Sequence, residues 1–219
     1  MIQAVCFDLD GTLYDDRQYI KAGLNEAAMY LKMETGKDLE DELKSIYFDE
    51  GEYSKAFDIL LERNNLSESY IPEMISAYHN NDADLSLYDS ALSTLEKLEQ
   101  RYKLAIITDG KNGYEKICRL GIESFFDEIF VTADHSLSKK KSEPFKKVMD
   151  TLSVEADKTA YVGNHPIVDV HHPNQLGMTT IRVKTGIQSD KDFNKDVTPD
   201  LEINNICELS DVLLHMNNE

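Results

Sequence analysis

The chain is poor in positive charge for its length. Lys and Arg together number 23 among 219 residues, against 41 Asp and Glu, which gives a net charge of -18 at pH 7. Because the phosphate backbone of a nucleic acid favours a basic face, this balance argues against nucleic acid as the main partner. An anionic substrate must therefore be attracted by local cations, since the overall field repels it.

Cysteine is also scarce, and long apolar segments are missing. The three cysteines Cys6, Cys118 and Cys207 are far apart and odd in number. This pattern favours buried thiols in a reducing compartment over a disulfide framework. No apolar segment reaches the length that spans a membrane. We therefore expect a soluble cytoplasmic protein with no membrane partner, and its oligomeric state stays open.

Strand and helix patterns alternate in most of the chain. Apolar runs predict buried strands at residues 2–7, 102–108, 128–132, 159–162 and 179–183, with a further short run at 201–203. Helical patterns separate these runs, and a polar loop is expected at 186–199. Alternation at this spacing predicts βαβ units with right-handed crossovers. The predicted fold class is α/β, with a Rossmann-like parallel sheet and helices on both faces.

A block between the first and second predicted strands is helical throughout. Apolar stripes at helical spacing begin at Ile20, Leu39, Ala56 and Ile71. Four short amphipathic helices can bury such stripes together as a small bundle. We therefore predict a small all-helical cap domain at residues 17–83, inserted into an α/β core that comprises residues 1–16 and 84–219.

The strongest local feature is Asp8-Leu9-Asp10-Gly11-Thr12, directly after the first apolar run. A buried strand has no reason to end in two acids unless its carboxyl end opens onto a polar site, where parallel α/β sheets bind ligands. Two carboxylates so close repel one another unless a proton or cation lies between them, which implies a metal. The alternative is an Asp-rich turn that caps the next helix.

Two further predicted strands end in polar residues. Thr108-Asp109-Gly110 follows the second strand, and Gly163-Asn164 follows the fourth. In a parallel sheet these ends face one edge, so they can share a site with the Asp8 motif. Lys139 lies in the loop after the third strand and can reach the same edge.

Together these motifs resemble those of the haloacid dehalogenase-like (HAD) hydrolase superfamily. Its motifs are Asp-x-Asp-Gly-Thr, a strand-ending Ser or Thr, a Lys, and Gly-Asp followed by a further acid. The motifs span residues 8–169, and the helical block lies where one branch of the family inserts its cap. The resemblance implies a phosphatase that hydrolyses a small phosphorylated metabolite through an aspartyl-phosphate intermediate with Mg²⁺.

The resemblance also implies a role for each acid. Asp8 resembles the nucleophile that forms the aspartyl-phosphate. Asp10 resembles the general acid that protonates the leaving alcohol and then, as base, activates water. We expect Asp8, the Asp10 carbonyl and Asp169 to hold Mg²⁺, with Asn164 assisting.

Phosphoryl binding falls to the second and third motifs. Thr108, Asp109 and Gly110 resemble the residues that bind the phosphoryl oxygens, and Lys139 resembles the cation that neutralises charge there. Lys139 is the first of three consecutive lysines. It is chosen because it lies six positions before Phe145, as the family lysine does before its helix Phe. The next two lysines are typical of a solvated patch.

The chain departs from the family pattern at Asn164, where Asp is usual, and Lys139 lacks a following Pro. Asn keeps an oxygen but loses a charge, so we expect weaker Mg²⁺ affinity without inactivity. A dehalogenase is disfavoured because those enzymes lack the second acid, here Asp10. A phosphomutase or phosphotransferase stays open, and so does a weakly active regulatory or binding relative, which Asn164 alone motivates.

Overall fold

The computed structural model describes residues 1–191 and 197–218. They form two compact units, which we call the α/β unit (Met1–Asp16 with Leu85–Glu219) and the helical unit (Arg17–Asp84). The loop expected at 186–199 begins with a short 3-10 turn, Gly186–Gln188. Its residues 192–196 lie outside the described part of the chain.

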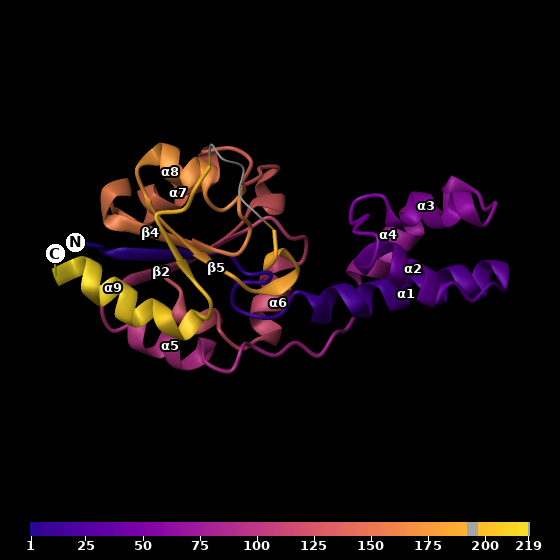
Figure 1. Cartoon of the computed structure of the whole chain (residues 1–219), viewed down its shortest axis with the longest axis horizontal. Helices are drawn as coiled ribbons and strands as arrows, with labels where there is room; N and C mark the ends of the chain where they lie inside the picture. Colours follow the sequence, from indigo (N-terminus) through magenta and orange to yellow (C-terminus); the bar gives the residue numbers. More distant parts are fainter. Residues whose placement is uncertain (192–196, 219) are drawn as a thin grey trace. The chain divides into compact units, whose positions relative to one another are not determined.

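A six-stranded sheet lies at the centre of the α/β unit, and all its strand pairs are parallel (Figure 1). Its strands are β1 (Ala4–Phe7), β2 (Lys103–Thr108), β3 (Glu128–Val131), β4 (Thr159–Gly163), β5 (Thr179–Val183) and β6 (Leu201–Ile203). Their spatial order is β3-β2-β1-β4-β5-β6, so the direction of strand addition reverses at β1. Ligands of open α/β sheets bind beside such a reversal, at the carboxyl ends of the strands.

Helices cover both faces of this sheet, as predicted. They are α5 (Ala91–Leu98), α6 (Gly113–Arg119), α7 (Glu143–Leu152), α8 (His171–Leu176) and α9 (Leu209–Asn218). In Figure 1, α7 and α8 lie on one side of the sheet, and α5 and α9 lie on the other. The predicted Rossmann-like fold is confirmed.

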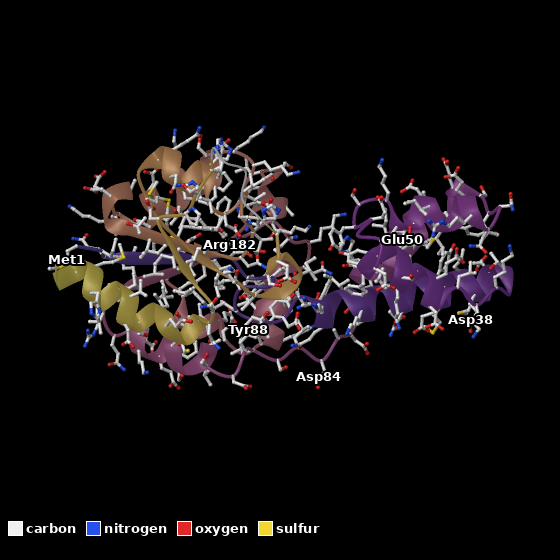
Figure 2. The ribbon with its side chains drawn as sticks, in the orientation of Figure 1. Met1, Asp38, Glu50, Asp84, Tyr88 and Arg182 are labelled. Carbon is white, nitrogen blue, oxygen red and sulfur yellow. The ribbon has the colours of Figure 1, made fainter. Side chains whose placement is uncertain are left out.

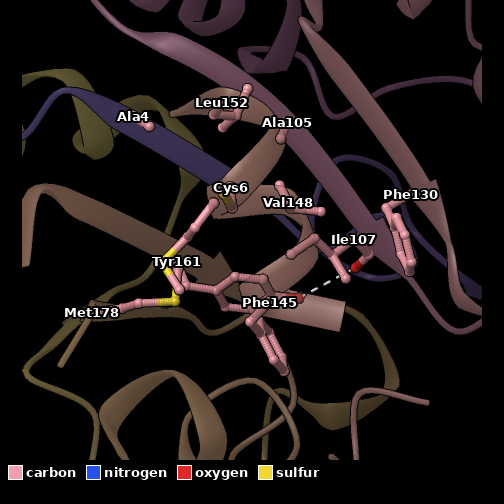
Figure 3. Packing of buried hydrophobic residues seen from close by; sticks show 11 residues of the cluster. Ala4, Cys6, Ala105, Ile107, Phe130, Phe145, Val148, Leu152, Tyr161 and Met178 are labelled. Carbon is pink, nitrogen blue, oxygen red and sulfur yellow. Dashed lines mark hydrogen bonds between the residues drawn. The ribbon is translucent and has the colours of Figure 1, made fainter. Parts of the chain in front are cut away.

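The core under α7 supports the strand ends (Figure 3). Its buried members are Ala4, Cys6, Ala105, Ile107, Phe130, Phe145, Val148, Met149, Leu152, Tyr161 and Met178. Alternate residues of a strand share a face, which brings Cys6 and Ile107 to the side that α7 covers. The Phe145 and Tyr161 rings meet edge to face at 5.1 Å, and the Tyr161 hydroxyl donates to the Ile107 carbonyl at 3.3 Å.

The helical unit is a bundle of α1 (Arg17–Thr35), α2 (Glu40–Phe48), α3 (Ala56–Arg63) and α4 (Ile71–His79). All its residues are described, and none lies in a strand. Helices α1 and α4 pack closely because Gly23 leaves room for Tyr78; a Cβ at Gly23 would lie 2.6 Å from that ring. The predicted all-helical unit is confirmed.

Two further findings concern the expectations from composition. Among the described residues, no helix is long and apolar enough to cross a membrane. The expectation of buried thiols is right for Cys6 and wrong for Cys118 and Cys207, which are exposed. Cys118 lies on the solvent side of α6, and Cys207 lies in a surface 3-10 turn, so neither is drawn into the core.

Candidate active site

The polar strand ends lie side by side at the carboxyl edge of the sheet. Strand β1 lies between β2 and β4, and Phe7 pairs with Ile106 on one side and Val162 on the other. The next residue is Asp8, whose amide donates to the Val162 carbonyl at 2.8 Å. This register places Asp8 beside Ile107 of β2 and Gly163 of β4, one residue before Thr108 ends β2.

Lys139 bridges two buried carboxylates at this edge. Its ammonium lies 2.5 Å from Asp8 Oδ1 and 2.8 Å from Asp169 Oδ1, and the three side chains are 6%, 7% and 1% exposed. Burial by itself lowers the pKa of Lys139, but the Asp169 and Asp8 carboxylates raise that pKa well above its usual value. The ammonium is therefore held in its charged form.

Asp8 lies in an excess of negative charge. Burial raises the pKa of Asp8 to about 7; Lys139 opposes this rise, while Asp169 and Asp10 add to it. Its second oxygen accepts a hydrogen bond from the Thr12 hydroxyl at 3.3 Å. The site thus has more carboxylates than its one bridging ammonium neutralises, a condition that favours binding of a further cation.

Asp10 is surrounded by donors that sequence reasoning did not identify. The Lys116 ammonium contacts both carboxylate oxygens, at 2.7 Å from Oδ2, and the Tyr14 hydroxyl donates to Oδ1. The Thr108 hydroxyl donates to Oδ2 at 3.4 Å. Burial raises the pKa of Asp10, but Lys116 and Tyr14 outweigh that effect and hold the pKa below its usual value.

Asp109 turns its side chain away from the strand end and toward the loop that carries Lys139. Its carboxylate accepts hydrogen bonds from the Thr132 hydroxyl at 2.6 Å, the Ser138 hydroxyl at 3.0 Å and the Lys139 amide at 2.7 Å. These three bonds join the end of β2 to the loop after β3. The side chain of Asp109 therefore organises the lysine loop.

Asn164 packs against the turn of the first motif. Its side-chain amide donates to the Thr185 carbonyl at 3.2 Å, and the Thr185 hydroxyl donates to the Gly11 carbonyl at 2.6 Å. Gly11 has a positive φ of 76°, and a Cβ there would lie 2.1 Å from the Asn164 amide nitrogen. Arg182 of β5, buried in the α/β unit (Figure 2), donates to the Asn164 backbone carbonyl at 3.3 Å.

Comparison with known proteins decides the family. The profile described as haloacid dehalogenase-like hydrolase matches residues 5–183. The chain belongs to this family. It is 33% identical, over an alignment of 230 positions, to a glyceraldehyde 3-phosphate phosphatase of Methanocaldococcus jannaschii, and the match covers 99% of each chain.

Solved structures of similar fold include a dehalogenase and a putative hydrolase of the family. A 2-haloacid dehalogenase from Pseudomonas syringae pv. Tomato matches with a TM-score of 0.72 and 25% identity, over 99% of this chain and 100% of that one. The putative HAD-hydrolase YfnB of Bacillus subtilis, bound to magnesium, matches with a TM-score of 0.75 and 22% identity, over 97% and 98%. The prediction of a HAD-like enzyme is confirmed, and the choice of activity rests on the site.

The donors of this HAD-like hydrolase suit a hard cation. Among the described residues, no group of three or more His, Cys, Asp or Glu side chains is arranged to hold a metal. The predicted set is mixed: the Asp8 and Asp169 carboxylates, the Asp10 backbone carbonyl and the Asn164 side-chain oxygen. Such oxygen donors fit Mg²⁺. Asp169 already accepts hydrogen bonds from Lys139 and, at 2.9 Å, from the His165 amide.

Sequence reasoning missed the partners of Asp10. Lys116 gives one signal in the sequence: with Gly113 and Ile117 it lies at the spacing of the buried face of α6, where a charged residue needs a partner. Tyr14 follows Asp10 by four residues but gives no comparable signal. Only the fold shows that both side chains meet the same carboxylate.

Proposed function

We propose that this hydrolase is a Mg²⁺-dependent phosphatase that acts on a small phosphorylated metabolite through an aspartyl-phosphate. The observation that carries the proposal is the buried ion pair of Lys139 with Asp8, next to a second acid, Asp10, at the switch point of the sheet. The glyceraldehyde 3-phosphate phosphatase named among its relatives makes that triose phosphate the first substrate to test.

In the first half-reaction an Asp8 oxygen attacks phosphorus, and the bond from phosphorus to the leaving oxygen breaks. Asp10 takes up a proton when the anionic substrate binds beside it and gives that proton to the leaving oxygen, so the product leaves as an alcohol. Lys139 offsets the negative charge on the transferring group and holds Asp8 by its other oxygen.

In the second half-reaction water attacks the aspartyl-phosphate. Asp10 takes a proton from this water, the Asp8–phosphorus bond breaks, and inorganic phosphate leaves. The same carboxyl group thus returns to the protonation state that it had with the substrate bound.

The phosphoryl oxygens are proposed to bind at the end of β2. The Thr108 hydroxyl and the backbone amides of Asp109 and Gly110 supply uncharged donors there. The Gly110 amide lies 3.4 Å from the Thr108 hydroxyl oxygen, so these donors belong to one turn. Phosphoryl transfer needs mainly positioning and neutralisation of charge, which these groups provide with Lys139.

We propose that Mg²⁺ is held by Asp8, the Asp10 carbonyl, Asp169 and Asn164. When bound, the ion would neutralise negative charge on the phosphoryl group beside Asp8. Because Asn164 supplies no charge, we propose that this chain binds Mg²⁺ more weakly than a variant with Asp at that position.

The second acid supports a phosphatase over a dehalogenase. Asp10 is partly exposed beside the buried Asp8, where a carboxyl group can move protons at the leaving oxygen, a role that attack on a carbon–halogen bond does not require. A phosphomutase would use the same two acids but return the phosphoryl group to a sugar. Release of inorganic phosphate from simple esters separates these two activities.

The test is phosphate release from a panel of phosphorylated metabolites, led by glyceraldehyde 3-phosphate, with Mg²⁺ or with EDTA. We expect turnover with Mg²⁺, loss with EDTA, and loss in Asp8→Asn. Asp150→Asn, an exposed change of the same kind on α7, should keep full turnover. No release from any panel member would contradict the proposal and favour a binding or regulatory protein.

A further inference from the structure

We infer that Lys116 is a positioning residue for Asp10 and that the Tyr14 hydroxyl helps to hold the same carboxylate. The inference rests on the proposed function, in which Asp10 moves protons at the leaving oxygen. It assigns two residues to this reaction that the motifs of the sequence do not contain.

The contact between Lys116 and Asp10 is a two-point contact. The ammonium reaches both carboxylate oxygens, so it restricts rotation of the carboxylate as well as its position. Its side chain is only 4% exposed, whereas that of Asp10 is 29% exposed. A buried ammonium is costly without a partner, and Asp10 provides that partner while one side of the carboxyl group stays open.

The start of α6 brings Lys116 to this place. Gly113, at the first turn, lies directly against β2 and β3; a Cβ there would be 2.8 Å from a methyl of Thr108 and 3.1 Å from one of Val131. This close approach directs the residue one turn later, Lys116, back over the strand ends. Gly110 leaves room for the ammonium, because a Cβ there would lie 2.8 Å from the Lys116 nitrogen.

Tyr14 contacts the carboxylate from the chain segment that follows the motif. Its ring is fully buried, and its hydroxyl donates to Asp10 Oδ1. The backbone fixes the ring, because the Gly11 amide donates to the Tyr14 carbonyl at 3.1 Å. Lys116 and Tyr14 thus hold the carboxyl group from two separate segments of the chain.

Orientation matters because a general acid must lie within hydrogen-bond reach of the oxygen that it protonates. An alkyl phosphate has a poor leaving group and needs this proton. An aryl phosphate such as p-nitrophenyl phosphate leaves as a stable anion and hardly needs it. If Lys116 aims Asp10, its loss must damage the alkyl reaction far more than the aryl reaction.

The experiment compares kcat/KM for glycerol 2-phosphate and p-nitrophenyl phosphate in wild type and Lys116→Met. This parameter reports the steps through formation of the aspartyl-phosphate. We expect a fall of about 100-fold with the alkyl ester and less than about 5-fold with the aryl ester. Lys146→Met, the same change at an exposed site of α7, should leave both values unchanged.

Tyr14→Phe and Lys116→Arg keep the test decisive if Lys116→Met does not fold. Tyr14→Phe removes one hydroxyl and should shift the same ratio in the same direction by about 5-fold. Lys116→Arg keeps the charge and the two-point contact, so it should recover most of the wild-type ratio. In an Asp10→Asn background, Lys116→Met should leave the ratio unchanged, since the residue that Lys116 positions is already inactive.

An equal loss with both esters, in Lys116→Met or Tyr14→Phe, would overturn the inference and leave a purely structural ion pair. In that case the wild type is still a phosphatase, so the proposed function stands. If the wild type hydrolyses neither ester nor any panel metabolite, the proposed function fails, and this inference fails with it.

Discussion

At the scale of single residues, the site is a balance between buried charges. Lys139 and the two carboxylates can all be buried because the ammonium lies between the carboxylates and offsets their charge. Removing one partner of such a group leaves an uncompensated charge, which costs far more than the pair contributes. The side chains of Lys139, Asp8 and Asp169 therefore affect both the activity and the stability of the protein.

Lys139→Met should destabilise the protein by about 3 kcal/mol, because it leaves Asp8 and Asp169 buried without their ammonium. The double variant Lys139→Met/Asp169→Asn should recover part of that loss, since it removes one of the two carboxylates, but should stay inactive. Urea unfolding followed by circular dichroism measures the stability. Lys140→Met, an exposed neighbour, is the control; a similar loss in that variant would contradict the explanation.

The three thiols should differ sharply in reactivity. Burial raises the pKa of Cys6 to about 12, so this thiol stays protonated and inaccessible at pH 8, whereas Cys118 and Cys207 are exposed. Iodoacetamide should therefore add two labels to the native protein and a third after denaturation, as counted by intact-mass spectrometry. Labelling of Cys6 in the native protein would contradict this burial.

At the scale of elements, the site depends on how one loop is attached to its neighbour. The loop after β3 carries Lys139, but the bonds that hold it come from Asp109 at the end of β2. Loops are mobile unless such bonds tie them to a rigid element. The lysine is thus positioned by the adjacent strand of the sheet.

Asp109→Ala should loosen residues 132–139 and lower kcat/KM by about 10- to 100-fold, because a small displacement of Lys139 misaligns the transferring group. Amide hydrogen exchange should accelerate in that loop and stay unchanged in β5. Ser138→Ala, which removes one of the three bonds, should have a smaller effect on both measurements. Unchanged exchange in Asp109→Ala would rule out this role.

At the scale of the whole molecule, a cation that binds only the folded chain stabilises all of it. Asn164 controls this linkage because it is the uncharged member of the proposed donor set. Its amide also joins the end of β4 to the loop after β5, through Thr185. A change at this position therefore affects the protein both with and without the ion.

Asn164→Asp should lower the melting temperature in EDTA, because it loses the donor to Thr185 and adds a carboxylate near Asp8. Mg²⁺ should raise the melting temperature of this variant more than that of the wild type, because tighter binding stabilises the folded chain more. The Mg²⁺ concentration that gives half-maximal activity should fall by about 10-fold. Asn25→Asp, the same change at an exposed site of α1, should have none of these effects. An unchanged Mg²⁺ dependence of both melting and activity would reject the role of Asn164.

Secondary structure followed from the sequence to within a few residues. The predicted strand at residues 179–183 is β5, and the predicted first strand at 2–7 is two residues longer at its start than β1. Helix α8 begins at His171, three residues after Val168, where its helical pattern starts in the sequence. The residues before it form a hydrogen-bonded turn, in which the Asp169 carboxylate accepts a hydrogen bond from the His165 amide. This turn positions Asp169 at the site, and the helix begins only after it.

By itself, the sequence determined the α/β alternation, the helical insertion and the common edge for Asp8, Thr108 and Asn164. These features rest on local periodicity and on the rule that parallel strands end at one edge. Cytoplasmic location stays a prediction. Only the tertiary structure decided that Lys116 meets Asp10, 106 positions earlier, and that Asp109 holds the Lys139 loop. No local pattern encodes such pairs, because side chains distant in sequence become neighbours only when the sheet is assembled.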